Sequence, residues 1–354
     1  DPSNPVNPAT GWRYIVMASL SDKSTFTDIY LAVSRNDNPQ RAYTNLKLGS
    51  DEVQDWLHLS LRVYEDQDNN PINHLSIRNP GISVDEDAIY ITGAMYNTRS
   101  EEFVESRVWI LDKAKLYNDI EGSYRKASPI YGTLPLISPP IQEPLVSVTK
   151  LVDPTLGVDI KPEIYMPAEI RGSLKTNKTD DSFGTFLVSY VWERTDGTGM
   201  TGFFHIFEVY DPMDAVPKLT PNVIAATSVV EDTDLPLPKG TQPDARYKKV
   251  ETLDRRVQRA TWYKETLWAS TTYRVLDDDG APEKAGVFWH RMDAPSNQTH
   301  NINYKYGGGI DAEGIANETS TYFGSIAVNV DNVLGIGFSA SGKNLYAGSF
   351  VTIH

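Results

Sequence analysis

The sequence contains no cysteine, so neither a disulfide bond nor a thiolate metal site can form. It has no apolar run long enough to cross a membrane as a helix, and we expect no membrane insertion. Positive charge is also scarce: the formal net charge is −14, and basic residues cluster only in the short pairs Lys248-Lys249 and Arg255-Arg256. Because nucleic acids require concentrated positive charge, the composition argues against a nucleic-acid-binding protein.

Turn-forming and aromatic residues are abundant instead. The 354 residues include 24 Gly, 22 Pro, 19 Tyr, 11 Phe and 7 Trp, and 40% of them are hydrophobic. Gly and Pro separate short elements, while aromatic residues are enriched in strands. The longest amphipathic helix that the pattern suggests is the short stretch 112–119. This composition favours many short elements with frequent turns and a chain long enough to bury a sizeable core.

A hairpin pattern recurs along the chain. The segment "GISVDEDAIYITGAMY" (81–96) aligns with "SIAVNVDNVLGIGFSA" (325–340), so that Gly93 meets Gly337, 244 residues later. In both copies apolar residues alternate before an acidic turn and resume after it, which is typical of two paired strands. A looser copy, "ATWYKETLWAS" (260–270), aligns with the first at an offset of 178 residues.

Two further copies are incomplete. The segment "IKPEIYMP" (160–167) resembles "RNPGISVD" (78–85), and its partner strand "TFLVSYVW" (185–192) follows a polar insertion. The N-terminal region supplies a partial unit, "YIVMASL" (14–20) and "DIYLAVS" (28–34). Strand sets that recur every ~65 to 100 residues predict radial repetition of antiparallel sheets, which is a β-propeller.

The predicted fold is a single β-propeller domain over residues 1–354, most simply with five blades of antiparallel strands. Residues 128–153 leave room for further strands, so six or seven blades are the alternative. A β-sandwich is a different all-β architecture, but the repeated inner-strand motif argues against it. The expected blade cores lie near residues 11–35, 73–118, 158–212, 254–295 and 320–354.

These motifs, together with "SRVWILDKAKLY" (106–117), resemble repeats in a broad group of secreted microbial β-propeller proteins. The resemblance covers all five units and implies the propeller fold and export from the cell. It implies no particular activity, because propellers serve as lectins, glycosidases, lyases and scaffolds. Three glycosylation sequons, beginning at Asn177, Asn297 and Asn317, and a chain that starts without Met also favour an extracellular location.

The repeat alignment predicts a ligand site at the axial mouth of the propeller, where the innermost strands begin. Arg78 aligns with Arg256 and Tyr322, and the match of "RNP" with "IKP" places Lys161 beside Asn79. Guanidinium groups bind carboxylates and sulfates through paired hydrogen bonds. The alternative is that these cations form structural salt bridges with nearby carboxylates. The predicted ligand-binding residues are Arg78, Asn79, Lys161, Glu163, Asp254, Arg256 and Tyr322.

The leading functional hypothesis is a secreted carbohydrate-binding propeller that favours anionic glycans at this mouth, with a polysaccharide as its partner. A polysaccharide-degrading enzyme is one alternative. Glycoside hydrolysis needs two carboxylates, which the aligned inner-strand positions do not supply, whereas Tyr322 with Arg78 or Arg256 suits a lyase. An extracellular scaffold that contacts proteins is the other alternative. The sequence assigns no catalytic residue and does not decide whether the protein is an enzyme.

No cofactor and no metal site are predicted. The six histidines form no metal-binding spacing, and His205 and His290 lie in apolar strands, which indicates core positions. Two acidic stretches, "EDQDNN" (65–70) and "DDDG" (277–280), offer oxygen ligands for calcium but are more typical of solvated turns.

The sequence also suggests structural or functional roles for one glycine-rich stretch and for three tryptophans. The stretch "GGGID" (307–311) lacks the Lys-Ser/Thr of a phosphate-binding loop and is expected to form a flexible turn. Trp56, Trp192 and Trp262 are the tryptophans best suited to stack on sugar rings, although packing within a blade is the more usual role of an aromatic side chain in a strand.

Overall fold

The computed structural model describes fourteen stretches of the chain, all of them strands or the turns and loops next to strands. They are residues 15–21, 27–34, 56–62, 75–113, 145–148, 164–171, 182–195, 199–214, 217–226, 236–244, 249–275, 284–296, 301–312 and 314–354. Within these stretches no helix is long and apolar enough to cross a membrane. The chain divides into two compact units, residues 1–82 with 86–148 and residues 83–85 with 149–354, which are described separately.

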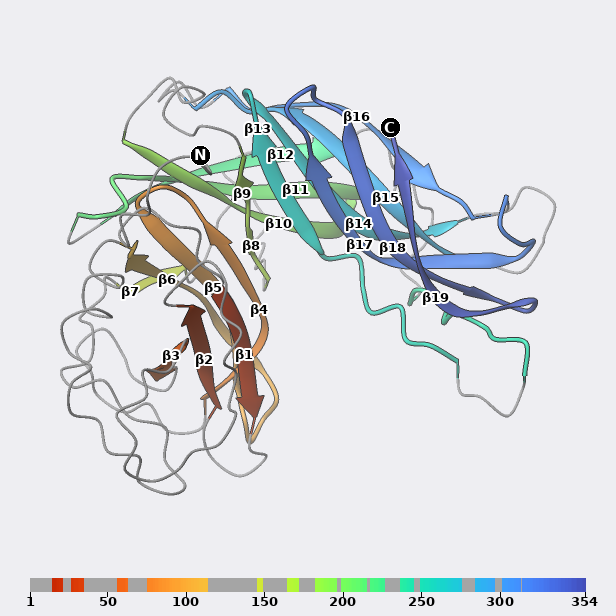
Figure 1. Cartoon of the computed structure of the whole chain (residues 1–354), viewed down its shortest axis with the longest axis horizontal. Coiled ribbons are helices and arrows are strands. Elements are labelled where there is room, and N and C mark those ends of the chain that lie inside the picture. Colours follow the sequence, from red (N-terminus) through yellow and green to blue (C-terminus); the bar gives the residue numbers. More distant parts are fainter. Residues whose placement is uncertain are drawn as a thin grey trace. The chain divides into compact units, whose positions relative to one another are not determined.

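The first unit contains two antiparallel sheets. One has the order β1-β2-β3, and the other has the order β4-β5-β6-β7 (Figure 1). Strand β7 lies in the region 128–153, where the sequence left room for further strands, and it extends the second sheet by pairing with β6. The strand bounds are β1 Ile15–Ser21, β2 Thr27–Ser34, β3 Trp56–Arg62, β4 Leu75–Val84, β5 Ala88–Asn97, β6 Phe103–Asp112 and β7 Leu145–Val148.

The second unit contains three sheets, with the orders β12-β11-β10-β8, β16-β15-β14-β13-β9 and β17-β18-β19. The middle strands of these sheets are long and largely apolar, and consecutive strands pair antiparallel. The bounds are β8 Met166–Pro167, β9 Glu169–Ile170, β10 Phe183–Thr195, β11 Gly199–Tyr210, β12 Lys218–Ala226, β13 Arg259–Tyr263, β14 Thr266–Val275, β15 Lys284–Asp293, β16 Asn303–Ile310, β17 Thr319–Val328, β18 Leu334–Gly342 and β19 Leu345–Ile353.

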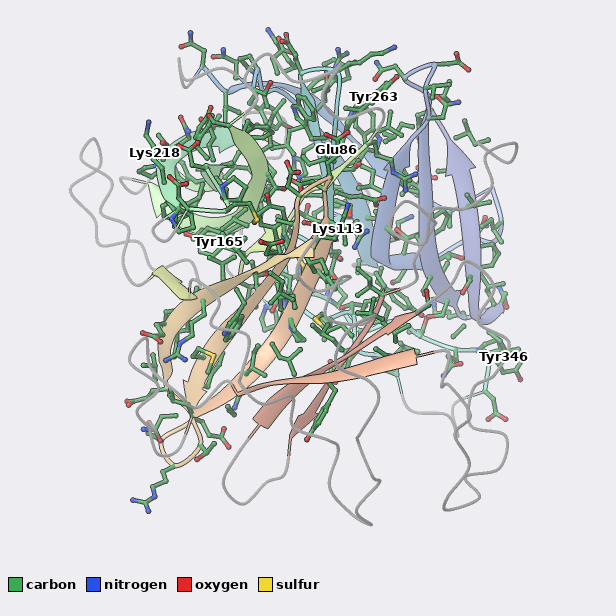
Figure 2. The ribbon with its side chains drawn as sticks, turned by 60° about the vertical axis from the view of Figure 1, so that its left-hand side comes forward. Glu86, Lys113, Tyr165, Lys218, Tyr263 and Tyr346 are labelled. Carbon is green, nitrogen blue, oxygen red and sulfur yellow. The ribbon has the colours of Figure 1, made fainter. Side chains whose placement is uncertain are left out.

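Apolar layers between successive sheets form the core of the second unit. One layer joins the sheet of β8, β10, β11 and β12 to the sheet of β9 and β13–β16, with Phe186 and Trp262 buried at its centre. A second layer joins the β13–β16 sheet to the β17–β19 sheet, with Trp268 and Ile336 buried in it. Strand β14 is buried on both faces because it lies between these two layers. Tyr263, which is labelled in Figure 2, adds a hydrogen bond between the two sheets, since its hydroxyl donates to the carbonyl oxygen of Val330 at 3.1 Å.

The backbone repeats the pattern that the sequence alignment predicts. Strands β4 and β17 are offset by 244 residues at both ends, as are Asn79 and Phe323, which both have a positive φ, 52° and 56°. The pairing of β17 with β18 shifts register at this point, between Tyr322 and Ser325, which marks a β-bulge. The two strands therefore share a positive-φ residue at the equivalent position as well as a hydrophobic pattern.

These features confirm the predicted fold class. The described part of the chain is all-β, and each of its five sheets consists mainly of antiparallel strands that follow one another in sequence, which is how the blades of a β-propeller are built. The sheets do not follow the predicted repeat boundaries throughout, because β9, within the predicted unit 158–212, pairs with β13 in the next sheet. The closure of a ring and the number of blades stay predictions.

Candidate functional site

The predicted ligand-binding residues fall into three groups. Lys161 and Glu163 lie outside the described residues. Arg78 and Asn79 lie on β4 of the first unit, where the guanidinium carbon of Arg78 is 4.3 Å from the ring centre of Tyr96. The remaining residues, Asp254, Arg256 and Tyr322, belong to the second unit.

Tyr322 is a core residue of the second unit. Only 1% of it is exposed, and its hydroxyl donates to Ser341 Oγ at 3.0 Å. Gly240 lies so close that a Cβ there would be 3.0 Å from the Tyr322 ring. The sequence placed this phenol at an open mouth, but the structure buries it, because the loop around Gly240 covers the start of β17.

Arg256 and Asp254 form the ion pair that the sequence left open as the structural alternative. The guanidinium donates to both carboxylate oxygens, and the backbone N–H of Arg256 also donates to Asp254 Oδ1 at 3.1 Å. The pair is local, two residues apart, just before β13. The Arg256 side chain is 15% exposed and that of Asp254 is 51% exposed. The pair therefore lies at the surface, with its cation tucked inward.

A second carboxylate nearby is shared by two arginines. Glu169 on β9 accepts from Arg171 Nη2 at 3.0 Å and from Arg259 Nη2 at 2.9 Å. This contact exists because β9 pairs parallel with β13 and Thr261 lies opposite Glu169. The arrangement brings residues 90 positions apart in the sequence to one surface.

Trp192, at the end of β10, completes this surface. Its indole ring is partly buried against the core, and the guanidinium carbon of Arg255 lies 5.8 Å from the ring centre. Trp262, the other tryptophan suggested for stacking in this unit, is fully buried and donates to the carbonyl oxygen of Ala294. The side chain of Trp56 lies outside the described residues. We call the surface formed by Arg171, Arg255, Arg256, Arg259, Glu169, Asp254, Gln258 and Trp192 the arginine cluster.

The arginine cluster contains hydrogen-bond donors that are not used. Arg171 Nε, Trp192 Nε1, Arg256 Nη1 and Gln258 Nε2 are each buried without a hydrogen-bond partner. Buried polar groups are almost always paired, so each such atom requires an acceptor such as water, an ion or a ligand. All four atoms are donors, which indicates that the missing partner is rich in acceptor oxygens.

The charges of the cluster point the same way. Four arginines face two carboxylates, which leaves a net charge of +2 in a chain whose formal charge is −14. Each of the two carboxylates is already held by at least one arginine. Arginine binds planar or tetrahedral oxyanions through two parallel hydrogen bonds. The geometry is therefore suited to a carboxylate or sulfate group.

Sequence reasoning found Asp254 and Arg256 but missed the residues that surround them. Gln258 and Arg259 follow in the same segment, "DRRVQR" (254–259), whose three arginines were the available signal. Glu169 and Arg171 alternate in "EIR" just after the interrupted inner strand. Nothing in the sequence marks the parallel pairing of β9 with β13 that joins the two segments.

Among the described residues we identify neither a candidate catalytic base nor a candidate metal site. Burial raises the pKa of the Tyr165 hydroxyl and lowers the pKa of His290 to about 3, so both groups stay neutral at neutral pH (Tyr165 is labelled in Figure 2). Groups of three or more His, Cys, Asp or Glu that would hold a metal ion are absent from the described stretches. The two acidic stretches considered for calcium, 65–70 and 277–280, lie outside them.

Comparisons with known proteins return structural likeness only. No protein-family model and no curated protein matches the sequence. An α-L-arabinanase of Penicillium chrysogenum complexed with arabinobiose is 12% identical with a TM-score of 0.38, and the match covers 96% of this chain and 70% of that one. A thermostable family-43 glycoside hydrolase is 10% identical with a TM-score of 0.34, over 98% and 91% of the two chains. Similarity this low assigns neither a site nor an activity.

Proposed function

We propose that the protein binds anionic glycans, and that the arginine cluster takes their carboxylate or sulfate groups. The observation that carries this proposal is the set of four buried donor atoms without acceptors, which lie on two arginines, a tryptophan and a glutamine of one surface. A bound uronate or sulfate ester supplies the missing acceptors with charged oxygen atoms. Each charge-assisted hydrogen bond formed in this way contributes about 1.5 to 3 kcal/mol.

Contact with the Trp192 ring would make the site bind an anionic sugar more tightly than a free anion. Its ring is partly exposed beside the arginines, and the indole presents an apolar face with one N–H at its edge. A pyranose has an apolar face of its own, so a uronate contacts the indole with its ring while its carboxylate reaches a guanidinium. An inorganic anion makes only the second contact.

The enzyme alternative has weaker support from the site. Glu169 and Asp254 both use their oxygens to bind arginines, whereas glycoside hydrolysis requires one carboxyl group as acid and one as base or nucleophile. The tyrosine considered as a lyase base, Tyr322, is buried and bonded to Ser341. Binding without bond cleavage therefore fits these residues best.

The binding experiment uses the whole protein and a panel of polysaccharides. Polygalacturonate and chondroitin sulfate are the anionic members, and arabinan and amylose are the neutral ones. We expect retention of the anionic polymers in affinity electrophoresis without new reducing ends and without absorbance near 235 nm. Release of products would favour the enzyme alternative, and retention of no polymer would favour a scaffold.

Variants of Arg256 locate the binding site. Arg256→Ala should weaken polygalacturonate binding about 10- to 100-fold, because it removes the unpartnered Nη1 donor together with its positive charge. Arg256→Lys keeps the charge, but a single ammonium group cannot bind Asp254 through two donors and also present Nη1 to a ligand, so it should recover only part of the affinity. Lys343→Ala is the matched control, since it removes one positive charge from an exposed ion pair with Glu318. Equal losses for Arg256→Ala and Lys343→Ala would mean that the net charge, not the cluster, governs binding.

An extracellular location is part of the same proposal, because anionic polysaccharides are found outside cells and on their surfaces. The sequon at Asn317 supports it: Asn317 is exposed, and the Thr319 hydroxyl of the same sequon donates to the carbonyl oxygen of Ala316 at 2.6 Å. Mass spectrometry of the protein from its native source should find a glycan at Asn317 if the chain passes through a eukaryotic secretory pathway.

A further inference from the structure

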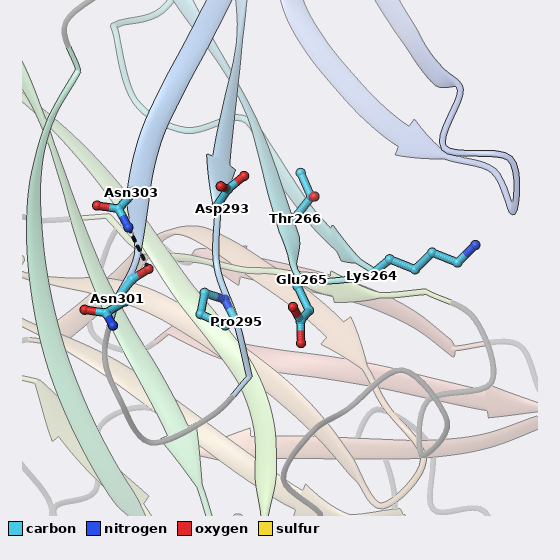
Figure 3. A pocket seen from close by; sticks show the side chains of 7 residues that line it. All are labelled: Lys264, Glu265, Thr266, Asp293, Pro295, Asn301 and Asn303. Atoms are coloured by element: carbon cyan, nitrogen blue, oxygen red, sulfur yellow. Dashed lines mark hydrogen bonds between the residues drawn. The ribbon is translucent and has the colours of Figure 1, made fainter.

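A second surface of the same unit, distinct in composition from the arginine cluster, lies at one end of the β13–β16 sheet. It is a hollow of about 420 Å³, lined by the Lys264-Glu265 turn, by Thr266 and Asp293, and by Asn301 and Asn303 (Figure 3). Its volume lies in the range of small-molecule sites, roughly 300 to 1,000 Å³. Almost every side chain that lines it is polar.

The strand register places this hollow beside a row of aromatic side chains. Thr266, Asp293 and Asn303 are directly opposite one another on β14, β15 and β16, and Figure 3 shows them in a row. Two residues further along β14 and β15, Trp268 is opposite Arg291, and Arg291 is opposite Tyr306, which is three residues from Asn303 because β16 has a register shift at this point. The contact of Arg291 with the Tyr306 ring and hydroxyl places Tyr306 on the same face. Side chains two residues apart share a face of a sheet and are separated by about 7 Å. The polar row and the aromatic row are therefore neighbours on one face.

The aromatic row contains donors without partners. Trp268 is 5% exposed and its Nε1 atom is buried without a hydrogen-bond partner, as is Arg291 Nε. The Arg291 guanidinium carbon lies 5.4 Å from the Trp268 ring centre and 5.3 Å from that of Tyr306, and its Nη1 donates to the Tyr306 hydroxyl at 2.6 Å. Tyr306 is 45% exposed, so an aromatic surface is open to solvent at the edge of the row.

The charges around the hollow are balanced, in contrast to those of the arginine cluster. Asp293 is paired with Lys305 at 2.8 Å, and Lys264 donates to the carbonyl oxygen of Val330 at 3.3 Å. In Figure 3 the Lys264 side chain extends away from the other side chains of the hollow. Asn303 donates to the carbonyl oxygen of Asn301 at 3.1 Å and keeps its own amide oxygen as an acceptor. The hollow thus offers donors and acceptors without an excess of either charge.

We propose that this face, Thr266, Asp293 and Asn303 with Trp268, Arg291 and Tyr306, is a second binding site that takes an uncharged sugar residue. Hydroxyl groups of the sugar pair with the amide and carboxylate groups of the polar row, and its ring lies on the exposed part of Tyr306. The unpartnered donors of Trp268 and Arg291 gain an acceptor from the same ligand. The site is independent of the arginine cluster, because it requires no anionic group.

The test titrates the full-length protein with three neutral trisaccharides, xylotriose, cellotriose and maltotriose, and follows binding by saturation-transfer NMR and calorimetry. We expect at least one of them to bind with a Kd below about 10 mM, and Tyr306→Ala to weaken that binding about tenfold. Asn303→Ala should weaken it several-fold, while Tyr306→Phe separates the contribution of the ring from that of the hydroxyl. Tyr346→Ala is the control, because Tyr346 is a similarly exposed tyrosine on β19.

The arginine cluster provides the remaining comparison. Arg256→Ala should leave trisaccharide binding unchanged, whatever its effect on polygalacturonate. The proposal is overturned if none of the trisaccharides binds, or if binding survives both Tyr306→Ala and Asn303→Ala. It is also overturned if Arg256→Ala abolishes trisaccharide binding, because the neutral sugar then occupies the arginine cluster. Because Tyr306 and Asn303 are exposed, both variants should fold, and near-ultraviolet circular dichroism checks this.

Discussion

His290 is a titratable side chain enclosed by rings. It is fully buried, and the rings of Phe204 and Phe288 each lie with their centres 4.8 Å from that of the imidazole. Its Nε2 is 2.9 Å from Thr271 Oγ1 and its Nδ1 is 3.2 Å from the Tyr304 hydroxyl. Both ring nitrogens thus have neutral hydrogen-bonding partners.

This environment makes the stability of the protein depend on pH. Burial lowers the pKa of His290 from 6.5 to about 3, so the unfolded chain binds the proton more readily than the folded one. The folded state with a neutral His290 therefore has its full stability above pH 6.5, and this contribution to the free energy of unfolding is lost as the pH falls toward 3. We expect His290 to contribute a decrease of about 1.4 kcal/mol in the free energy of unfolding for each pH unit in that window. Urea denaturation at pH 7, 6, 5 and 4 measures it.

The variant His290→Gln isolates this contribution. Glutamine can still donate to one neighbour and accept from the other, but it does not titrate. Its free energy of unfolding at pH 7 should be lower than that of the wild type, and its pH dependence below 6.5 should be shallower. Parallel pH profiles for the two proteins would show that other groups, such as the carboxylates, cause the whole effect.

At the scale of the element, two glycines that align in the sequence have different surroundings. A Cβ on Gly93 of β5 would lie 2.1 Å from Ile77 Cδ1 and 2.4 Å from Ile77 Cγ1, and Ile77 is a buried, β-branched residue. A Cβ on Gly337 of β18 would meet nothing closer than the Phe350 carbonyl oxygen at 3.9 Å. The same residue type is therefore required in one sheet and dispensable in the other.

We accordingly predict opposite effects for the same substitution. Gly93→Ala should lower the free energy of unfolding by about 1 to 3 kcal/mol, because Ile77 has a stiff χ1 and little space to move. Gly337→Ala should be neutral or raise it by about 0.5 kcal/mol, since alanine loses less backbone entropy than glycine on folding. Chemical denaturation of the two variants side by side provides the measurement. A larger loss for Gly337→Ala would indicate that another surface packs on β18.

The strands themselves were largely predictable from the sequence. Alternating apolar residues identified the β4–β5 and β17–β18 hairpins, and an Asp-Asn pair marked the turn at Asn332, whose φ is 65°. The interrupted copy also pairs as expected, because β8 is antiparallel to β10 with Leu187 opposite Pro167. These elements depend on local patterning and turn residues, which a single sequence displays directly.

The stretch "GGGID" was predicted wrongly, for a reason that depends on tertiary structure. Gly307, Gly308 and Gly309 lie within β16 and do not form a flexible turn. A Cβ on Gly308 would be 3.0 Å from the Trp289 indole, and one on Gly309 would be 2.3 Å from the Tyr273 hydroxyl. The glycines make room for aromatic rings on neighbouring strands, and a local reading of glycine as a turn former does not detect such contacts.

The candidate site was predictable only where it is local. Asp254 and Arg256 are two residues apart, so a sequence argument reached their ion pair. The contact of Arg259 with Glu169 depends on a two-residue strand, β9, that pairs parallel with β13. A strand of that length has no detectable periodicity. The burial of Tyr322 likewise depends on a loop more than 80 positions away in the sequence, which the alignment of repeats did not consider.

At the scale of the whole molecule, the net negative charge of the protein repels the proposed anionic ligand. The chain carries −14, whereas the arginine cluster carries +2. A long polyanion feels both fields, because its segments extend past the cluster over the acidic surface. A short uronate feels mainly the cluster. Screening distinguishes the two fields, since the Debye length is about 30 Å at 0.01 M salt and about 10 Å at 0.1 M.

Polymer length should therefore change the salt dependence of binding. Raising the salt concentration from about 0.01 M first screens the long-range repulsion by the acidic surface and strengthens polygalacturonate binding. Above about 0.1 to 0.2 M it also weakens the short-range contacts with the arginines, so affinity should pass through a maximum. Digalacturonate should instead bind progressively more weakly as salt is added. Calorimetric titrations of both ligands across this range test the difference. If polygalacturonate affinity falls from the lowest salt onward, as it does for a basic protein, the polymer does not approach the acidic surface, and the arginine cluster must then lie apart from it.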